Sequence, residues 1–342
     1  MTSVGKMLGG FALTRKLTSG LFNYQNPMLE QTVLGIKFKN PVGLAAGFDK
    51  DAQLTKILPE VGFGFEEIGS VTGERCEGNP KPRLWRLPKS KSLIVYYGLK
   101  NDGAEAISKR LQGAKFVFPI GISVAKTNCK ETVETEAGIA DYLKAYKAFQ
   151  NIGDYYTINI SCPNAFGGQP FTDPQKLERL LQEISKLPKT KPIFLKMPPD
   201  ISHNQIDAII SLAEKYKIDG FICTNLTKER DLPSFKEKIK DELPTDKGGL
   251  SGKVVEGLAD EMIKYIYKKT GGQFVIIGLG GIFNAEDAYR KIRAGVSLVQ
   301  LITGMIFEGP QLIGEINRGL VELLQKDGFK NISEAIGVDN IY

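Results

Sequence analysis

A repeated alternation of two kinds of segment constrains the fold of this chain more than any other feature. A short apolar or β-branched run that ends in Gly, Ser, Asn or Thr is followed each time by a longer stretch with helical periodicity. Within 204–216, for example, Ile206, Ile209 and Ile210 fall on one helical face. Eight strand-like runs can be counted, at residues 42–46, 65–70, 120–124, 156–161, 193–197, 220–224, 274–278 and 298–303.

Strands that alternate with helices form a parallel sheet with right-handed crossovers, and eight repeats without a sign of a sheet edge favour closure of that sheet. The sequence therefore predicts an α/β fold, a single parallel (β/α)8 TIM barrel over residues 33–342, with a short N-terminal helical extension over residues 1–32. An open, doubly wound sheet is the main alternative. Residues 71–118 and 226–252 are long for βα connections, and we expect them to cover the active site as lids or to contribute residues to it.

Residues 1–24 are compatible with an amphipathic helix that faces a membrane surface or an electron acceptor. Their apolar side chains recur at near-helical spacing beside three cations, although two consecutive glycines weaken the helix. A helix packed across the barrel floor and a frayed terminus are the alternatives. The apolar positions are Val4, Met7, Leu8, Phe11, Leu17, Leu21 and Phe22.

Composition argues against several classes of protein. The formal net charge is +6, and the basic residues are scattered rather than gathered in one stripe, which argues against nucleic acid as a partner. The four cysteines form no C-x-x-C pair, so neither a zinc site nor a disulfide framework is expected. No run approaches the ~20 apolar residues of a membrane-spanning helix. We expect a cytoplasmic protein, or one attached peripherally at the inner face of the cell membrane, and a homodimer is compatible with the sequence.

The single histidine and the scatter of the acidic residues restrict the chemistry. His203 lies at an expected helix start and is interpreted as a surface residue, which argues against a Ser-His-Asp triad. Because no His or carboxylate cluster follows the expected strands, no metal is predicted.

Glycines after the last two strands indicate a ligand that carries phosphate. In such barrels the active site forms at the carboxyl ends of the strands, and phosphate commonly binds after strands seven and eight. Gly280 and Gly281 follow the seventh run, and Thr303 and Gly304 follow the eighth, so backbone N–H groups and a hydroxyl are available there. Tight-turn geometry alone is the alternative explanation.

Two further strand ends carry reactive side chains. Lys196 ends an otherwise apolar strand, so its ammonium must reach solvent or an acceptor; a flavin would meet that need, and a salt bridge at the barrel mouth is the alternative. Residues 159–164 place Cys162 between Asn159 and Asn164 on a Pro-stiffened turn. The two carboxamides suit a planar ring with amide-like edges, and the thiol can act as a base where thiolate is favoured.

Several segments resemble dihydroorotate dehydrogenases, from about residue 33 to residue 320. The motifs occur in the family's order and spacing, which is far more specific than any one of them. They are NPVGLAAGFDKD at 40–51, GFGFEEIGSVT at 62–72, GNPKPRLWRLP at 78–88, INISCPN at 158–164, GGLSG at 248–252, and IIGLGGI and RAGVSLVQLITG within 276–304.

The resemblance implies FMN-dependent oxidation of (S)-dihydroorotate to orotate in de novo pyrimidine (UMP) biosynthesis. Cys162 would be the base that removes the C5 proton, and hydride would pass from C6 to N5 of FMN. Lys50, Asn159, Asn164 and Asn225 would bind the substrate. The positions that match the family's FMN site are Ala45, Ala46, Gly47, Lys50, Ser70, Ser123, Asn159, Lys196, Thr224, Ser251, Gly252, Gly280, Gly281, Thr303 and Gly304.

The family divides by its base and its electron acceptor, and this chain combines features of both classes. The barrel, including PRLWRLP, resembles the membrane-associated, quinone-using class 2, whereas Cys162 stands where class 2 has Ser and the soluble class 1 has Cys. The leading segment is shorter than the usual two-helix extension of class 2. The acceptor therefore stays open between quinone, fumarate and NAD through a separate iron–sulfur flavoprotein subunit.

Three positions depart from the family's pattern. Val95 stands where an Asn binds the pyrimidine, Leu226 where Thr or Ser follows the Thr-Asn pair, and Ser123 where an Asn commonly contacts the flavin. Each lost substrate contact would cost roughly 1–3 kcal/mol if its partner stayed buried and unpaired. An FMN oxidoreductase of the same family that acts on a different cyclic amide or enoate is therefore one alternative, and a non-catalytic flavin-binding partner protein is another. The side chains that could replace the lost contacts are Tyr96, Tyr97 and Lys100.

Overall fold

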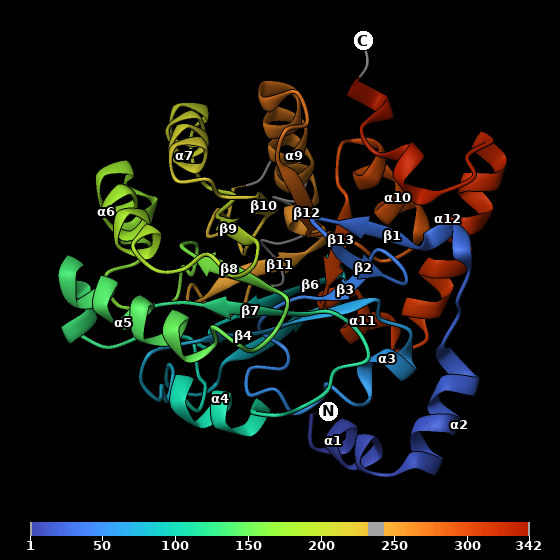
Figure 1. The fold of residues 1–342 in the computed structure, drawn as a ribbon, viewed down its shortest axis with the longest axis horizontal. Helices are drawn as coiled ribbons and strands as arrows, with labels where there is room; N and C mark the ends of the chain where they lie inside the picture. Colours follow the sequence, from blue (N-terminus) through green and yellow to red (C-terminus); the bar gives the residue numbers. More distant parts are fainter. Residues whose placement is uncertain (1, 232–242, 341–342) are drawn as a thin grey trace.

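A closed barrel of eight parallel strands forms the centre of the computed structural model, which describes residues 2–231 and 243–340 (Figure 1). Each strand pairs in parallel with its two neighbours, and β13 pairs with β3 to close the ring. The predicted (β/α)8 barrel is thus confirmed, and the open sheet is excluded. The strands are β3 (Val42–Leu44), β4 (Phe65–Val71), β7 (Ile120–Val124), β8 (Tyr155–Asn159), β9 (Ile193–Met197), β10 (Gly220–Cys223), β12 (Val275–Leu279) and β13 (Leu298–Leu301).

Helices surround the barrel, and most of them bury an apolar face against it. In α6 the buried side chains Leu177, Leu181 and Ile184 follow the helical period. The Asp173 side chain caps the same helix by accepting a hydrogen bond from the Lys176 N–H. The helices are α3 (Leu58–Val61), α4 (Ala104–Leu111), α5 (Thr135–Ala148), α6 (Pro174–Ser185), α7 (His203–Lys215), α9 (Glu256–Thr270), α10 (Ala285–Arg293), α11 (Thr303–Glu308) and α12 (Leu312–Asp327).

Aromatic side chains fill the lower part of the barrel interior. The Phe65 and Tyr155 rings lie 6.5 Å apart, and Phe194 lies 5.4 Å from Tyr155. Glycines make room for these rings, because a Cβ at Gly43 would come within 2.3 Å of the Phe65 ring and one at Gly121 within 2.1 Å of the Tyr155 ring. The barrel is therefore closed at its floor, and ligands must enter from the carboxyl ends of the strands.

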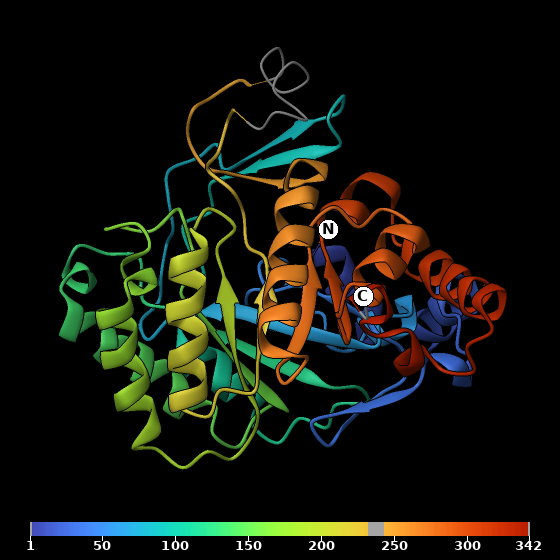
Figure 2. The ribbon, with the colours of Figure 1, turned by 90° about the horizontal axis from the view of Figure 1, so that it is seen from above.

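Two small antiparallel sheets lie outside the barrel, at opposite ends (Figure 2). The hairpin of β1 (Gln31–Val33) and β2 (Ile36–Phe38) covers the floor, where Phe38 packs against Phe65 at 5.3 Å. The other sheet joins the two predicted site-building insertions, because β6 pairs both with β5 and with the distant β11. Its strands are β5 (Leu84–Leu87), β6 (Ser92–Val95) and β11 (Gly249–Gly252).

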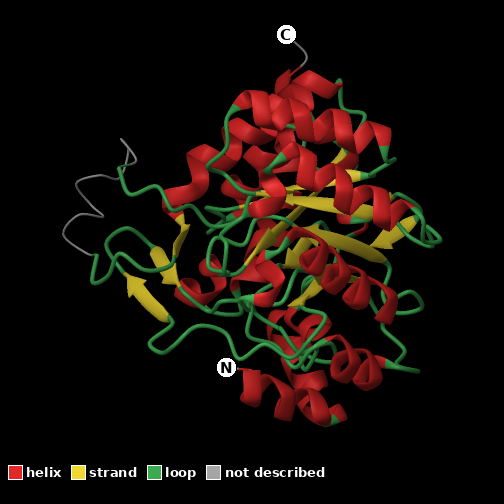
Figure 3. Ribbon diagram, turned by 90° about the vertical axis from the view of Figure 1, so that its left-hand side faces the viewer, coloured by secondary structure: helices red, strands yellow, loops and turns green. Residues whose placement is uncertain are grey.

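The N-terminal segment forms two helices, α1 (Thr2–Gly10) and α2 (Ala12–Phe22), beside the barrel (Figure 3). The expected helical structure is confirmed, with a break at Phe11. Gly5 and Gly9 face Leu54 and Ile57, which follow the carboxyl end of β3, so the helices do not cross the barrel floor. Among the described residues, no helix has the length and apolar character needed to span a bilayer.

Candidate active site

A cavity of about 460 Å³ opens at the carboxyl ends of the barrel strands. A volume in this range suits a small-molecule or cofactor site. All but one of the predicted site residues line it, although they come from elements far apart in the sequence. The lining residues among those predicted are Ala45, Ala46, Gly47, Lys50, Ser70, Asn159, Cys162, Asn164, Lys196, Thr224, Asn225, Ser251, Gly252, Gly280, Gly281, Thr303 and Gly304.

Lys50 extends into the cavity from the loop after β3. Its Nζ donates a hydrogen bond to the Gly47 carbonyl and lies 4.8 Å from the centroid of the Tyr97 ring. Burial lowers the pKa of Lys50 to about 8, and the opposing effect of the Cys162 thiolate is smaller. The side chain is therefore a cation at neutral pH that loses its charge under mildly alkaline conditions.

Cys162 lies close to two lysines. Burial raises the pKa of the Cys162 thiol, while a hydrogen bond from the Asn164 backbone and the charges of Lys50 and Lys126 act to lower it. Sequence reasoning missed Lys126, which is 3% exposed and donates from Nζ to the Phe166 carbonyl at 2.8 Å. Burial thus disfavours the thiolate, and the two lysines favour it.

Hydrogen bonds to other parts of the chain fix three asparagine amides in the cavity that contains Cys162. Asn159 Nδ2 donates to Ser70 Oγ at 2.7 Å, and Asn164 Nδ2 donates to the Val95 carbonyl at 2.8 Å. Asn225 Nδ2 donates to the carbonyl and to the hydroxyl of Ser161, at 3.0 and 2.9 Å. These bonds orient the amides before a ligand binds, which reduces the entropy lost on binding.

The opposite end of the cavity is built from backbone and hydroxyl groups. Ser251 Oγ and Thr303 Oγ1 lie 2.9 Å apart, and the Gly280–Gly281 turn is nearby in the same wall. Gly252 has a φ of +99°, and a Cβ there would lie 2.4 Å from the Lys91 carbonyl oxygen. Only glycine fits at this position, and it leaves room for a ligand group to approach the backbone.

Comparison with known proteins identifies the family. The family model described as dihydroorotate dehydrogenase matches residues 28–324.

The chain belongs to the dihydroorotate dehydrogenase family.

Relatives and solved structures agree with this assignment over nearly the whole chain. The dihydroorotate dehydrogenase (quinone) of Trichodesmium erythraeum is 40% identical over 331 residues, which are 94% of this chain and 86% of the relative. That of Crocosphaera subtropica is 41% identical over 325 residues, covering 93% and 85%. A crystal structure of the Eimeria tenella enzyme in complex with ferulenol superposes with a TM-score of 0.84 at 29% identity, covering 96% of each chain.

The three positions that depart from the family's pattern lie at two different depths. Val95 and Leu226 both line the cavity, so the two apolar substitutions face any ligand directly. Tyr97 and Lys100 line it as well, whereas Tyr96 does not. Ser123 lies behind the wall, fully buried, with its hydroxyl 2.8 Å from Ser70 Oγ. It reaches the cavity only through Ser70, which in turn accepts from Asn159.

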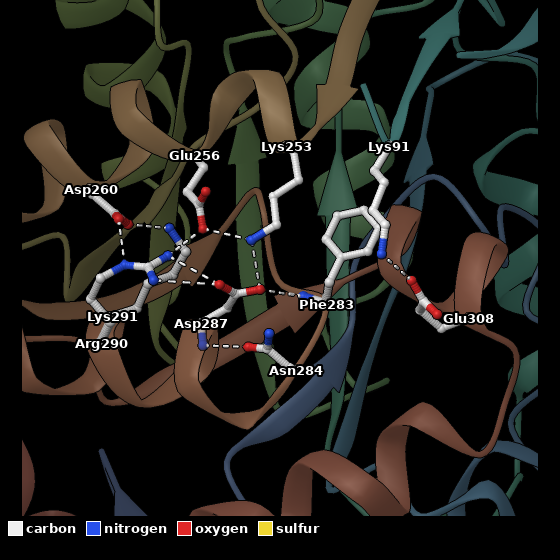
Figure 4. A network of polar contacts seen from close by, with 10 residues as sticks. All are labelled: Lys91, Lys253, Glu256, Asp260, Phe283, Asn284, Asp287, Arg290, Lys291 and Glu308. Atoms are coloured by element: carbon white, nitrogen blue, oxygen red, sulfur yellow. Dashed lines mark hydrogen bonds and ion pairs between the residues drawn. The ribbon is translucent and has the colours of Figure 1, made fainter. Parts of the chain in front are cut away.

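In this dihydroorotate dehydrogenase family member, a network of charged side chains supports the glycine-rich end of the cavity (Figure 4). Lys253 Nζ bridges Glu256 at 2.9 Å and Asp287 at 2.8 Å, and Asp287 also accepts from the Phe283 backbone N–H at 2.9 Å. The contacts tie the turn after β11 to the segment after Gly281 and to the starts of α9 and α10. Sequence reasoning missed this network, because Lys253 and its partner Asp287 lie 34 residues apart in the sequence.

Proposed function

We propose that the chain oxidises (S)-dihydroorotate to orotate with FMN, as a step of pyrimidine biosynthesis. The observation that carries the proposal is the convergence of Lys50, Cys162 and three asparagines on one cavity whose far end is glycine-rich. Membership of the family and the names of its relatives support the same activity.

The residues present fit FMN. The Ser251 and Thr303 hydroxyls, together with the Gly280–Gly281 turn and the start of α11, would hold the phosphate, as expected after the last two strands of such a barrel. Lys196 is 3% exposed and lines the cavity, so its ammonium suits the pyrimidine edge of the ring. Ala45, Ala46, Gly47, Lys50, Ser70, Asn159 and Thr224 would bind the remainder, with Ser123 acting through Ser70.

Each substrate-binding residue has a definite chemical task. The Lys50 ammonium would bind the carboxylate of dihydroorotate, and the amides of Asn159, Asn164 and Asn225 would bind the polar edges of its ring. In its thiolate form, which the neighbouring lysines favour, Cys162 would take the C5 proton onto Sγ and become the neutral thiol. Bound FMN would supply the acceptor for the hydride from C6.

Anaerobic mixing of the oxidised protein with dihydroorotate tests the proposal, because loss of the oxidised flavin spectrum reports reduction directly. Cys162→Ala should slow reduction by about 10²–10⁴-fold while FMN stays bound, since the thiol is the base. Cys129→Ala is a matched control, because Cys129 does not line the cavity. A flavin that stays oxidised in the native protein contradicts the proposed activity, and equal effects of the two variants contradict the role of Cys162.

A second candidate function keeps the chemistry and changes the substrate. Val95 and Leu226 present apolar side chains to the cavity, so a cyclic amide or enoate with fewer polar groups would bind better than dihydroorotate. Reduction of the flavin by such a compound, but not by dihydroorotate, would favour it. Bound FMN that no dihydropyrimidine reduces, together with stable association with another subunit, would instead favour the non-catalytic alternative.

Quinone is the electron acceptor that we propose. The relatives are named as quinone enzymes, and the cavity extends past the apolar side chains of Leu84, Phe283 and Ile306 to Thr2 at the start of α1. Fumarate and an NAD-linked subunit are the competing acceptors, and steady-state turnover of the pure protein with each of them separates the three.

The N-terminal helices would place the part of the cavity beside Thr2 at a membrane surface. The apolar side chains of Phe11, Leu13 and Leu17 are 64%, 69% and 60% exposed, which suits insertion at the lipid interface. Replacing Leu13 and Leu17 together by Ser should reduce binding to lipid vesicles and turnover with quinone. Val117→Ser, at a 68% exposed position on the barrel floor, is the control. Equal vesicle binding by the two variants would contradict the membrane role.

A further inference from the structure

Glu67 is a fully buried carboxylate inside the barrel, and the proposed reaction gives it no task. It lies on β4, whose neighbours in the barrel are β3 and β7. Its contacts nevertheless reach side chains on β8, β9 and β13. The carboxylate therefore projects across the interior, between the aromatic floor and the cavity.

The two oxygens of Glu67 have different surroundings. Oε2 accepts hydrogen bonds from Gln300 Nε2 at 2.9 Å, from Thr157 Oγ1 at 3.1 Å and from the Tyr155 hydroxyl at 3.4 Å. Oε1 has no hydrogen-bond partner among the described residues, and it lies 3.9 Å from Lys196 Nζ. Three neutral donors thus hold one oxygen in place, and the other faces the lysine.

Stability alone does not account for this arrangement. A buried ion pair contributes little net stability, because the cost of removing two charges from water offsets their attraction. Phe65 and Phe194, one layer below, show that apolar side chains can fill this barrel. Lys196 is the side chain that connects the pair to the cavity, since it lines the wall and Glu67 does not.

We propose that Glu67 is a positioning residue for the flavin reaction: it keeps Lys196 charged and directed at the cavity. The proposal rests on the proposed function, because the charge of Lys196 matters most beside a flavin that becomes anionic on reduction. Gln300, Thr157 and Tyr155 fix the carboxylate, and the carboxylate fixes the ammonium.

The electrostatics of Lys196 are consistent with this role. Burial lowers the pKa of Lys196, and the charge of Glu67 is the largest effect that opposes the decrease, followed by the Cys162 thiolate. The other charged group that interacts with Lys196 in the cavity is Lys50, whose like charge disfavours two ammonium groups together. Without Glu67, Lys196 should lose its proton at a lower pH.

Glu67→Gln tests the proposal, because it removes the charge at nearly constant shape. Trace acetylation of Lys196 is followed across pH by mass spectrometry in the flavin-free protein. The titration midpoint of Lys196 should be about 1–3 pH units lower in Glu67→Gln than in the native protein. In the flavin-loaded protein, the midpoint potential should acquire a pH dependence that begins at the new Lys196 midpoint.

Glu66→Gln is the matched control. Glu66 is also fully buried on β4, where burial and the neighbouring Asp49 raise its pKa well above the usual range, but it is not among the groups whose charge acts on Lys196. An unchanged Lys196 midpoint in Glu67→Gln, or an equal shift in both variants, would overturn the proposal. So would a native protein in which Lys196 is already neutral at pH 7, a measurement that needs no variant.

The acetylation measurement uses neither FMN nor dihydroorotate. A negative result there refutes the role of Glu67 and leaves the proposed reaction standing. Failure of dihydroorotate to reduce the flavin would refute the proposed reaction and leave the effect of Glu67 on Lys196 standing.

Discussion

Raising the pH from 7 to 9 should weaken the binding of dihydroorotate, because we propose Lys50 as the cation that binds its carboxylate. Burial lowers the pKa of this lysine to about 8. Below that value the side chain is an ammonium, and above it the side chain is a neutral amine that no longer attracts an anion. The charge-dependent part of binding is therefore present at pH 7 and is lost as the pH rises through 8.

The size of the effect follows from proton linkage. Each pH unit above the pKa of the free protein should weaken binding about tenfold, so the dissociation constant should rise roughly tenfold between pH 7 and pH 9. The increase should level off once the charge-assisted contact, worth about 1.5–3 kcal/mol, is lost.

Binding is best measured in Cys162→Ala, which should bind the ligand with greatly slowed turnover and removes the titration of the thiol. Calorimetry or the shift of the bound-flavin spectrum gives the dissociation constant at each pH. Lys50→Met in the same background should bind weakly and without pH dependence. A dissociation constant that stays constant from pH 7 to 9, or an identical slope in the Lys50→Met protein, would refute the reasoning.

Two further predictions concern packing and specificity. Gly121→Ala should lower the free energy of unfolding in urea by about 1–3 kcal/mol, because its Cβ would lie 2.1 Å from the Tyr155 ring, which has no free space to move. Gly257→Ala, with no atom within 4 Å, should stay within about 0.5 kcal/mol of the native value, and similar losses in both would contradict the packing argument. Val95→Asn and Leu226→Thr should each tighten dihydroorotate binding, by about 1–3 kcal/mol where the new group finds its partner on the ligand. No gain from either change, measured by titration of the bound flavin, would show that other side chains already make these contacts.

The barrel strands could be read from the sequence because their signals are local. A run of apolar residues that ends in a polar or glycine residue reports a buried strand and the start of its loop within about six positions. The order of the strands around the barrel then follows, since parallel strands joined by helices are placed in sequence. The side chains at or just after the end of each run, such as Cys162 and Thr303, had to meet at one end of the barrel, and they line the same cavity.

The insertions were harder to predict. Their polar composition indicates loops, and nothing local in residues 84–95 indicates pairing with residues 249–252, which lie more than 150 positions away. Pairing across such a distance depends on where the barrel places the two chain segments. For the same reason, the sequence did not indicate the charge network of Lys253, Glu256 and Asp287.

The sequence by itself determined the alternation of strands and helices, the number of strands and the residue types available at each strand end, because these depend on near neighbours along the chain. Only the tertiary structure decided that Ser123 lies behind Ser70, that Glu67 crosses the barrel to face Lys196, and that burial moves the pKa of Lys50 to about 8. Distances through space and loss of solvent set these properties, and neither can be assigned before the chain has closed on itself.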